Sequence, residues 1–227
     1  TLKANTTGCN NAAFGSYGLC SNTTGKYNTS SGYYSSLKNT TGCFNTAHGA
    51  YALRENTTAN NNTAVGACSL YANTTGADNV AVGFKALKAN TTGSKNAAFG
   101  NYALCTNTTG GCNVAMGCVS LLSNTTGNYN SAIGIGALQN NTTASQNLAT
   151  GYRSLYTNTT GSYNTASGAQ SLYSNTSGIY NTIIGRDAGY HNTTGSCNSV
   201  LGAAALLCNT SGGFNVAVGR AALISNT

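Results

Sequence analysis

Apolar and polar positions follow a pattern that returns along the whole chain every 17 residues. Numbered from the Asn of each Asn-Thr-Thr-Gly sequence, the repeat reads N-T-T-G-x-x-N-x-A-x-G-x-x-A/S-L-x-x, and the positions marked x vary freely. Positions 6 to 11 alternate with the period of a β-strand, as in residues 95–100. The chain is therefore predicted to be a tandem array in which every repeat has the same structure.

Each repeat is predicted to form one coil of a β-solenoid. A unit of 17 residues is too short for a helical repeat, which needs about 33, and Gly and Asn are poor helix formers. Asn-Thr-Thr-Gly suits a tight corner, because Asn tolerates the left-handed region and Gly permits positive φ. The predicted fold class is all-β: a β-solenoid (β-roll) of about 13 stacked 17-residue coils, each with two or three short strands.

Residues 1–227 are expected to be a single continuous repeat array and a segment of a longer one, because the chain begins and stops inside a repeat. Ala at position 9, Ala or Ser at position 14 and Leu at position 15 are predicted to fill the narrow interior. Gly at position 11 is predicted to mark a corner without room for a Cβ. The Asn at position 7 is predicted to form a ladder of side-chain amides from coil to coil. This column consists of Asn11, Asn28, Asn45, Asn62, Asn79, Asn96, Asn113, Asn130, Asn147, Asn164, Asn181, Asn198 and Asn215.

Position 10 is apolar in most repeats, although it adjoins the small residue at position 9. Examples are Val82, Phe99 and Ile184. Neighbouring residues of a strand point to opposite faces, so one apolar column must face outward. An outward apolar stripe predicts lateral association of identical chains. The alternative is that position 10 points inward and Ala at position 9 points outward.

Charged residues are few and confined to variable positions. Ten Lys and Arg and three Asp and Glu give a net charge of +7, and all of them lie at positions 5, 6, 12, 13, 16 or 17. These columns are therefore predicted to face solvent. The basic residues are too sparse to follow a nucleic-acid backbone, so no nucleic-acid partner is expected. No apolar run is long enough for a membrane span.

Nine cysteines lie in variable columns on both sides of the Asn-Thr-Thr-Gly corner. Cys105 and Cys112 flank one corner and are the best candidates for an intrachain disulfide, which would indicate an oxidising compartment. The alternative is that the thiols remain free. No pattern typical of a metal site occurs, and neither metal nor cofactor is expected, although covalent glycans would fit the sequence.

The head of every complete repeat is an acceptor pattern for N-glycosylation, Asn-x-Thr or Asn-x-Ser. One interpretation is a column of glycans on exposed turns. The other is that Asn and Thr form a turn and stack without sugar. The candidate acceptors are Asn5, Asn22, Asn39, Asn56, Asn73, Asn90, Asn107, Asn124, Asn141, Asn158, Asn175, Asn192 and Asn209. Further acceptor patterns occur at Asn28, Asn61 and Asn140.

The small-residue motif N-x-A-x-G, as in residues 96–100, resembles the β-roll head repeats of trimeric autotransporter adhesins. The wider array is similar to repeats of phage-type and marine extracellular fibre proteins. These resemblances imply a structural, adhesin-like protein outside the cell or at its surface, whose partners are copies of itself in a fibre, and also glycans or cell surfaces. The repeat is longer than that of the adhesin heads, which leaves coil handedness and chain number open.

The sequence bears on two other functions. The segment x-x-N-x-A-x-G is similar to the units of plant antifreeze β-rolls, which makes ice binding the alternative function. Adjacent threonines such as Thr6 and Thr7 argue against it, since they would face opposite ways in a strand. An enzyme is not expected, because Glu55, Asp78 and Asp187 lie on well-separated coils and leave no acid and base to meet. The 14 tyrosines flank the turns, where they either pack over corners or stack on sugars.

Overall fold

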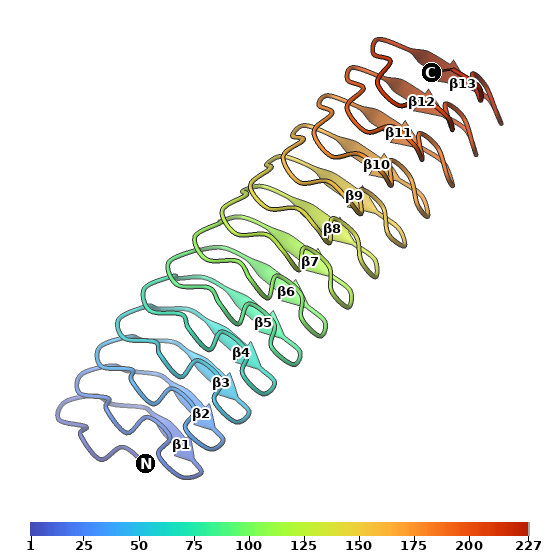
Figure 1. The fold of residues 1–227 in the computed structure, drawn as a ribbon. Helices are drawn as coiled ribbons and strands as arrows, with labels where there is room; N and C mark the ends of the chain where they lie inside the picture. The colour runs from blue at the N-terminus through green and yellow to red at the C-terminus, as the bar shows by residue number, and fades with distance from the viewer. Residues whose placement is uncertain (227) are drawn as a thin grey trace. The chain divides into compact units, whose positions relative to one another are not determined.

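The structure is a computed structural model that describes residues 1–226. Its contacts divide the chain into two compact units, the N-terminal half (Thr1–Cys112) and the C-terminal half (Asn113–Thr227). Each half is a β-solenoid in which every 17-residue repeat forms one coil (Figure 1). No helix occurs in residues 1–226, so none of them forms an apolar helix that could cross a membrane. Position 227, the end of the predicted array, lies outside the described residues.

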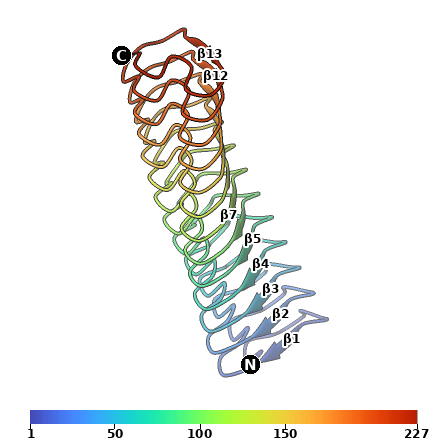
Figure 2. The ribbon, with the colours of Figure 1, turned by 90° about the vertical axis from the view of Figure 1, so that its right-hand side faces the viewer.

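Each coil contributes one short strand to a parallel sheet. In the N-terminal half these are β1 (Ala12–Phe14), β2 (Thr29–Ser31), β3 (Thr46–His48), β4 (Thr63–Val65), β5 (Val80–Val82) and β6 (Ala97–Phe99). In the C-terminal half they are β7 (Val114–Met116), β8 (Ser131–Ile133), β9 (Leu148–Thr150), β10 (Thr165–Ser167), β11 (Thr182–Ile184), β12 (Ser199–Leu201) and β13 (Val216–Val218). Within each half, the strands stand in one row along one side of the coils (Figure 2).

The register follows the repeat without a slip. Ala47 in β3 pairs with Ala64 in β4, and Ala166 in β10 pairs with Ile183 in β11, each partner 17 positions further along. The expectation of two or three strands per coil is wrong: each coil has one strand of three residues. The rest of the coil consists of bends and turns, although its backbone groups still bond to adjacent coils, as Leu53 N does to Ser69 O at 3.0 Å.

Left-handed backbone at non-glycine residues explains why the strands are so short. Positions 6, 13 and 15 have positive φ in nearly every repeat, for example 60° at Lys95, 58° at Tyr102 and 51° at Leu104. This conformation costs an L-residue about 1–2 kcal/mol, and it turns the chain three times within one coil. The hydrogen bonds to neighbouring coils offset the cost, because they form only when each coil adopts the same path.

The interior contains the predicted small and apolar columns. Ala at position 9 and Leu at position 15 are fully buried in the middle of each half, as at Ala81 and Leu87, or Ala149 and Leu155. The alternative orientation, with position 10 inside, is therefore wrong. One departure shows how the core compensates: Gly189 stands where other repeats have Leu, and a Cβ added there would lie 3.4 Å from Ile183 Cγ2. The larger Ile183 fills the space at position 9.

The predicted ladder at position 7 is present. Within each half, the backbone N–H of one Asn donates to the side-chain oxygen of the Asn one coil earlier at 2.9–3.1 Å, as from Asn45 to Asn28 and from Asn147 to Asn130. The side-chain nitrogen of Asn28 also donates to the carbonyl oxygen of Gly42 at 2.8 Å. Each amide therefore ties its own coil to its neighbours, which satisfies a polar column that is almost entirely buried.

Glycines at positions 4 and 11 allow adjacent backbones to approach closely. At Gly32 an added Cβ would lie 2.5 Å from the carbonyl oxygen of Gly49, and φ is +144°. This confirms the predicted corner without room for a Cβ. Position 4 differs, because its glycines do not have φ in the left-handed range. At Gly42 an added Cβ would lie 2.5 Å from Asn39 Oδ1, but Ala59 and Ala144 occupy this position in two other repeats and are buried, so position 4 accepts Ala as well as Gly.

Candidate functional surfaces

The asparagines at position 1, predicted to lie on exposed turns, are buried instead. Asn22 to Asn209 of this column are at most 1% exposed, whereas Asn5 and Asn226, at the two ends of the described column, are partly exposed. Asn73 Nδ2 donates to Asn56 Oδ1 at 3.0 Å and to Gly76 O at 2.9 Å. The same side-chain bond joins successive asparagines within each half at 2.7–3.1 Å, as Asn192 and Asn209 show.

This geometry argues against the expectation of a glycan on each corner. A side-chain amide has two N–H groups, and here one donates to the preceding coil and one within its own coil, so a sugar on Nδ2 would replace one of these hydrogen bonds. The candidate acceptors that are buried in the folded structure are Asn22, Asn39, Asn56, Asn73, Asn90, Asn107, Asn124, Asn141, Asn158, Asn175, Asn192 and Asn209. The other acceptor patterns differ: Asn28 is buried, Asn140 is partly exposed and Asn61 is exposed.

The corner thus contains a second asparagine column, which sequence reasoning missed. The carbonyl oxygen of Gly42 accepts from Asn39 Nδ2 at 3.0 Å and from Asn28 Nδ2 at 2.8 Å. Position 4 is therefore the point at which the columns at positions 1 and 7 meet. Asn at every position 1 was visible in the sequence, but an acceptor site and a buried ladder require the same residue type.

The threonines of the corner divide into two columns. Thr40 at position 2 donates its hydroxyl to the carbonyl oxygen of Thr57 in the next coil at 3.1 Å. Thr41 at position 3 is exposed, as is every other residue of its column. The corner therefore presents one row of hydroxyl groups to solvent and holds the other row against the backbone.

The predicted disulfide between Cys105 and Cys112 is absent. All nine cysteines are free, and both of these are partly exposed. Burial raises the pKa of the Cys105 thiol, while Lys88 and Lys85 act weakly in the opposite direction. In residues 1–226, no group of three or more His, Cys, Asp or Glu side chains could hold a metal ion.

The outward face of each sheet is the most continuous surface in each half. Residues at positions 8 and 10 point away from the buried Ala at position 9, as the exposure of β7 shows: Val114 is partly exposed, Ala115 is buried and Met116 is exposed. The face contains no Lys, Arg, Asp or Glu, and its one ionisable side chain is His48. Removing an uncharged face of this kind from water costs little desolvation free energy.

The two halves differ in how apolar this face is. In the N-terminal half, β2 and β3 present Thr, Ser and His. In the C-terminal half, Ile184, Leu201 and Val218 are 41%, 53% and 69% exposed. The side chains of β11, β12 and β13 enclose a shallow, mostly apolar hollow here. Exposed apolar side chains therefore gather on these three strands.

Tyrosines form columns of stacked rings on the outer surface. In the N-terminal half, Tyr17 stacks on Tyr34 with ring centroids 4.8 Å apart. In the C-terminal half, Tyr156, Tyr173 and Tyr190 stack with centroids 5.1 and 4.8 Å apart. Because ring faces inside a column contact one another, the geometry favours packing over sugar binding for these rings.

The charged side chains lie on the outside, as predicted, and several rest on tyrosines. No Lys, Arg, Asp or Glu in residues 1–226 is buried. The Arg153 guanidinium lies 5.1 Å from the Tyr152 ring and 5.2 Å from the Tyr156 ring. In the N-terminal half, Glu55 accepts from Lys38 and from Arg54, each at 2.6 Å. These contacts fix long side chains on the coil surface and bring no acid close to a base in a cleft.

Comparison of the chain with protein-family models, with curated proteins and with solved structures finds no match. The function therefore has to be argued from the surfaces themselves. Three surface features can carry such an argument: the uncharged outward face of the strands, the exposed threonine column and the stacked tyrosines of the N-terminal half.

Proposed function

We propose that the chain is a structural, non-catalytic segment of an extracellular or cell-surface fibre, in which identical chains associate through the outward face of their sheets. The observation that carries the proposal is the strand with two uncharged faces. Ala98 lies in the core, whereas Ala97 and Phe99 point to solvent on the same strand. Without a partner, this face leaves apolar side chains in water on coil after coil.

The regular repeat supports a second copy of the chain as the partner. Two copies of this chain have the same period, so side chains that interdigitate at one coil can do so at every coil. The interface would have no charge to desolvate. It would also cover the strands most exposed to solvent, β11 to β13, where Val216 is 72% exposed. The resemblance to adhesin heads and fibre repeats agrees with an extended, self-associating role outside the cell.

Analytical ultracentrifugation of the chain and of matched lysine variants tests the interface. We expect concentration-dependent association that Ile184→Lys together with Val218→Lys weakens by about tenfold or more, because each buries an unpaired charge. The control is Thr194→Lys together with Ser211→Lys, which adds the same two charges to exposed residues of the corner. A chain that stays monomeric at every concentration, or a control that weakens association equally, would contradict the proposal. Electron microscopy of associated material should show filaments.

Ice binding is a second candidate, favoured by one observation. Thr29, Thr46 and Thr63 occupy position 8 on three consecutive paired strands, and all three are at least partly exposed. They therefore form a short, regular row of hydroxyl and methyl groups on a sheet surface. Thermal hysteresis of the purified chain tests this function. Hysteresis that disappears in Thr46→Lys, on the outward face, but persists in Thr58→Lys, in the corner, would favour ice binding over the fibre.

A further inference from the structure

The tyrosine column at position 13 of the N-terminal half is interrupted by a small residue. Tyr34 stacks on Tyr17 at 4.8 Å and on Tyr51 at 5.9 Å, with the rings within 4° of parallel. The next coil has Cys68 in this position, with φ of 58°, close to the 59° of Tyr51. The backbone therefore continues unchanged while the ring is missing. The stack ends at Tyr51, and the place of a fourth ring is open.

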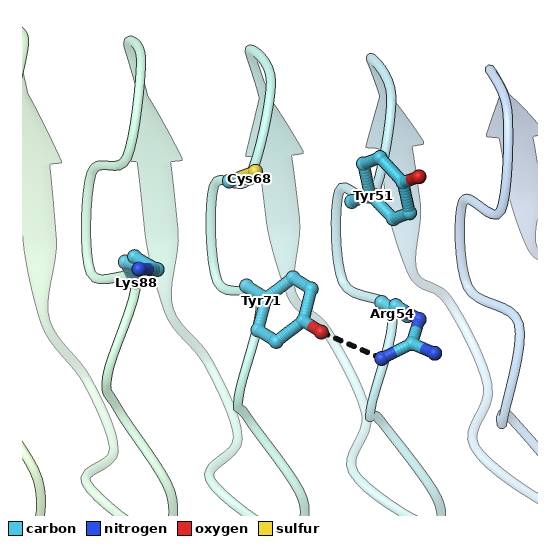
Figure 3. Close-up of a pocket in the computed structure, with 5 residues that line it drawn as sticks. All are labelled: Tyr51, Arg54, Cys68, Tyr71 and Lys88. Atoms are coloured by element: carbon cyan, nitrogen blue, oxygen red, sulfur yellow. Dashed lines mark hydrogen bonds between the residues drawn. The ribbon is translucent and has the colours of Figure 1, made fainter.

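A shallow, open cavity of about 460 Å³ lies at this interruption. It is lined by Tyr51, Arg54, Cys68, Tyr71 and Lys88, which come from three successive coils (Figure 3). The ring of Tyr71 lies 6.4 Å from that of Tyr51 and is tilted by 55°, so the two rings make an angled wall rather than a closed stack. The volume falls within the range of small-molecule sites, which begins at about 300 Å³.

Two cations border the cavity, and their partners differ. Arg54 Nη1 donates to Glu55 Oε1 and to Tyr71 Oη, each at 2.6 Å, which holds the guanidinium beside Tyr71 (Figure 3). Its Nε is buried and has no hydrogen-bond partner in the described structure. Lys88 has no carboxylate within ion-pair distance among residues 1–226. The ammonium group of Lys88 is therefore available to an anion, whereas the Arg54 guanidinium is already paired with Glu55 and Tyr71.

We propose that this slot binds one planar aromatic ring system that carries an anionic group, of which an aryl carboxylate is the simplest example. The ring system lies on Tyr51, in the place that a fourth tyrosine would occupy, and the anion faces Lys88. Stacking on Tyr51 contributes the same kind of contact that joins the three tyrosines. Lys85 occupies position 13 in the coil after Cys68. Its Nζ lies over the rings of Phe84 and Tyr102, 4.8 and 5.3 Å from their centroids.

The column itself offers a matched pair of variants. Cys68→Tyr fills the slot with the residue present in the three preceding coils, in a backbone conformation that those tyrosines already adopt. Cys68→Ala keeps the slot open and removes the thiol. Lys88→Gln removes the ammonium group and leaves the Arg54 contacts in place. Circular dichroism and thermal unfolding of each variant show whether it folds as the wild type does.

Ligand-observed NMR titration with 2-naphthoate tests the site, and the neutral 2-naphthamide serves as the matched ligand. We expect the wild type and Cys68→Ala to bind naphthoate equally, and Cys68→Tyr to bind about tenfold more weakly because its ring occupies the slot. Naphthamide should bind severalfold more weakly than naphthoate to the wild type. That preference should shrink in Lys88→Gln and at high salt.

A second readout locates the ligand on the unmodified chain. Naphthoate should slow alkylation of Cys68 by iodoacetamide, measured by peptide mass spectrometry, and leave the partly exposed Cys197 in the other half unaffected. Absence of binding to the wild type, equal binding by folded Cys68→Tyr, or equal affinity for naphthamide would each overturn the proposal. Equal protection of Cys68 and Cys197 would also overturn it, because the ligand would then bind without preference for the slot.

Discussion

In the N-terminal half, three stacked tyrosines at position 13 end at a small cysteine, and a cavity bordered by two cations opens there. In the C-terminal half, three tyrosines stack at position 16 over three coils, while an apolar hollow forms on the outward face of β11 to β13. The net charge also differs, +5 in the N-terminal half and +2 in the C-terminal half. Core columns are nonetheless the same in both.

This difference shows which positions of the repeat are constrained by folding. Positions 1, 4, 7, 9, 11 and 15 contact the coil before and the coil after, so a change there affects three coils. Side chains at positions 5, 6, 8, 10, 12, 13, 16 and 17 contact neighbours only along the surface. The slot and the hollow therefore arise from surface columns alone, on the same coil backbone.

The largest expected effect is the same in both halves, because it concerns the shared core. Asn73→Ala and Asn175→Ala each remove an amide that donates twice and also accepts from the next coil. We expect each to lower the free energy of unfolding by about 3 kcal/mol or more, since buried partners are left unsatisfied. Urea unfolding measures the loss, and hydrogen exchange shows in which half it occurs.

Thr75→Ala is the control for these asparagine variants. It destroys the same acceptor pattern as Asn73→Ala, but Thr75 is exposed and the asparagine column stays intact. If Thr75→Ala lost as much stability as Asn73→Ala in protein from a glycosylating host, a glycan and not the ladder would be the source of the stability. Unequal losses in Asn73→Ala and Asn175→Ala would show that the two cores are not equivalent.

The next effect separates backbone proximity from backbone conformation. At Gly168, φ is +134° and an added Cβ would lie 2.6 Å from the carbonyl group of Gly185. At Gly219, φ is +114° and nothing lies within 4 Å of the added Cβ. We expect Gly168→Ala to lose about 3 kcal/mol and Gly219→Ala about 1 kcal/mol, because only the first adds a steric clash to the strain. Equal losses would mean that conformation alone makes Gly necessary at position 11.

A smaller effect should stabilise both halves by the same amount. Lys95 and Gln146 are exposed residues at position 6, with φ of 60° and 59°. Lys95→Gly and Gln146→Gly should each raise the free energy of unfolding by about 1 kcal/mol, since Gly adopts this conformation without the clash that an L-residue incurs. Thermal unfolding measures the gain. A loss in both variants would argue against the left-handed backbone at position 6.

The smallest effect concerns thiol reactivity. Burial raises the pKa of Cys105, so at a given pH a smaller fraction of it is thiolate, the reactive form. At about pH 8, below the range in which a raised thiol pKa lies, alkylation of Cys105 should be slower than that of the exposed Cys208 in the other half. The difference should narrow as the pH rises. Equal rates throughout would contradict the burial of Cys105.

Much of the fold could be predicted because the same pattern occurs thirteen times in the sequence. The period defines the coil, the alternation puts positions 9 and 10 on opposite faces, and the variable columns show where solvent is. The burial of position 9 then decides which of the two faces is the interior. Position 15 was also predicted correctly as interior, but its left-handed backbone was not. Nothing about Leu104 by itself indicates φ of 51°, because only contact with adjacent coils makes that conformation favourable.

The candidate sites were harder to predict. Cys105 and Cys112 flank a corner in the sequence, yet they remain free thiols. Cys68 by itself does not indicate a binding site. The slot exists because Tyr51 lies one coil before Cys68 and because Arg54 and Lys88 border the gap. A cavity of this kind depends on which residues stand 17 positions apart on successive coils. No single column of the repeat shows that combination.

The sequence by itself determined the coil: a 17-residue period with small, apolar and amide residues at constant positions has one economical way to stack. It also determined which columns face solvent, because charges occur only there. The direction of the corner asparagine was decided by the tertiary structure. Asn-Thr-Thr-Gly can present Asn outward to a sugar or inward to another Asn, and the choice follows from a hydrogen-bond partner that exists only when the next coil is in place.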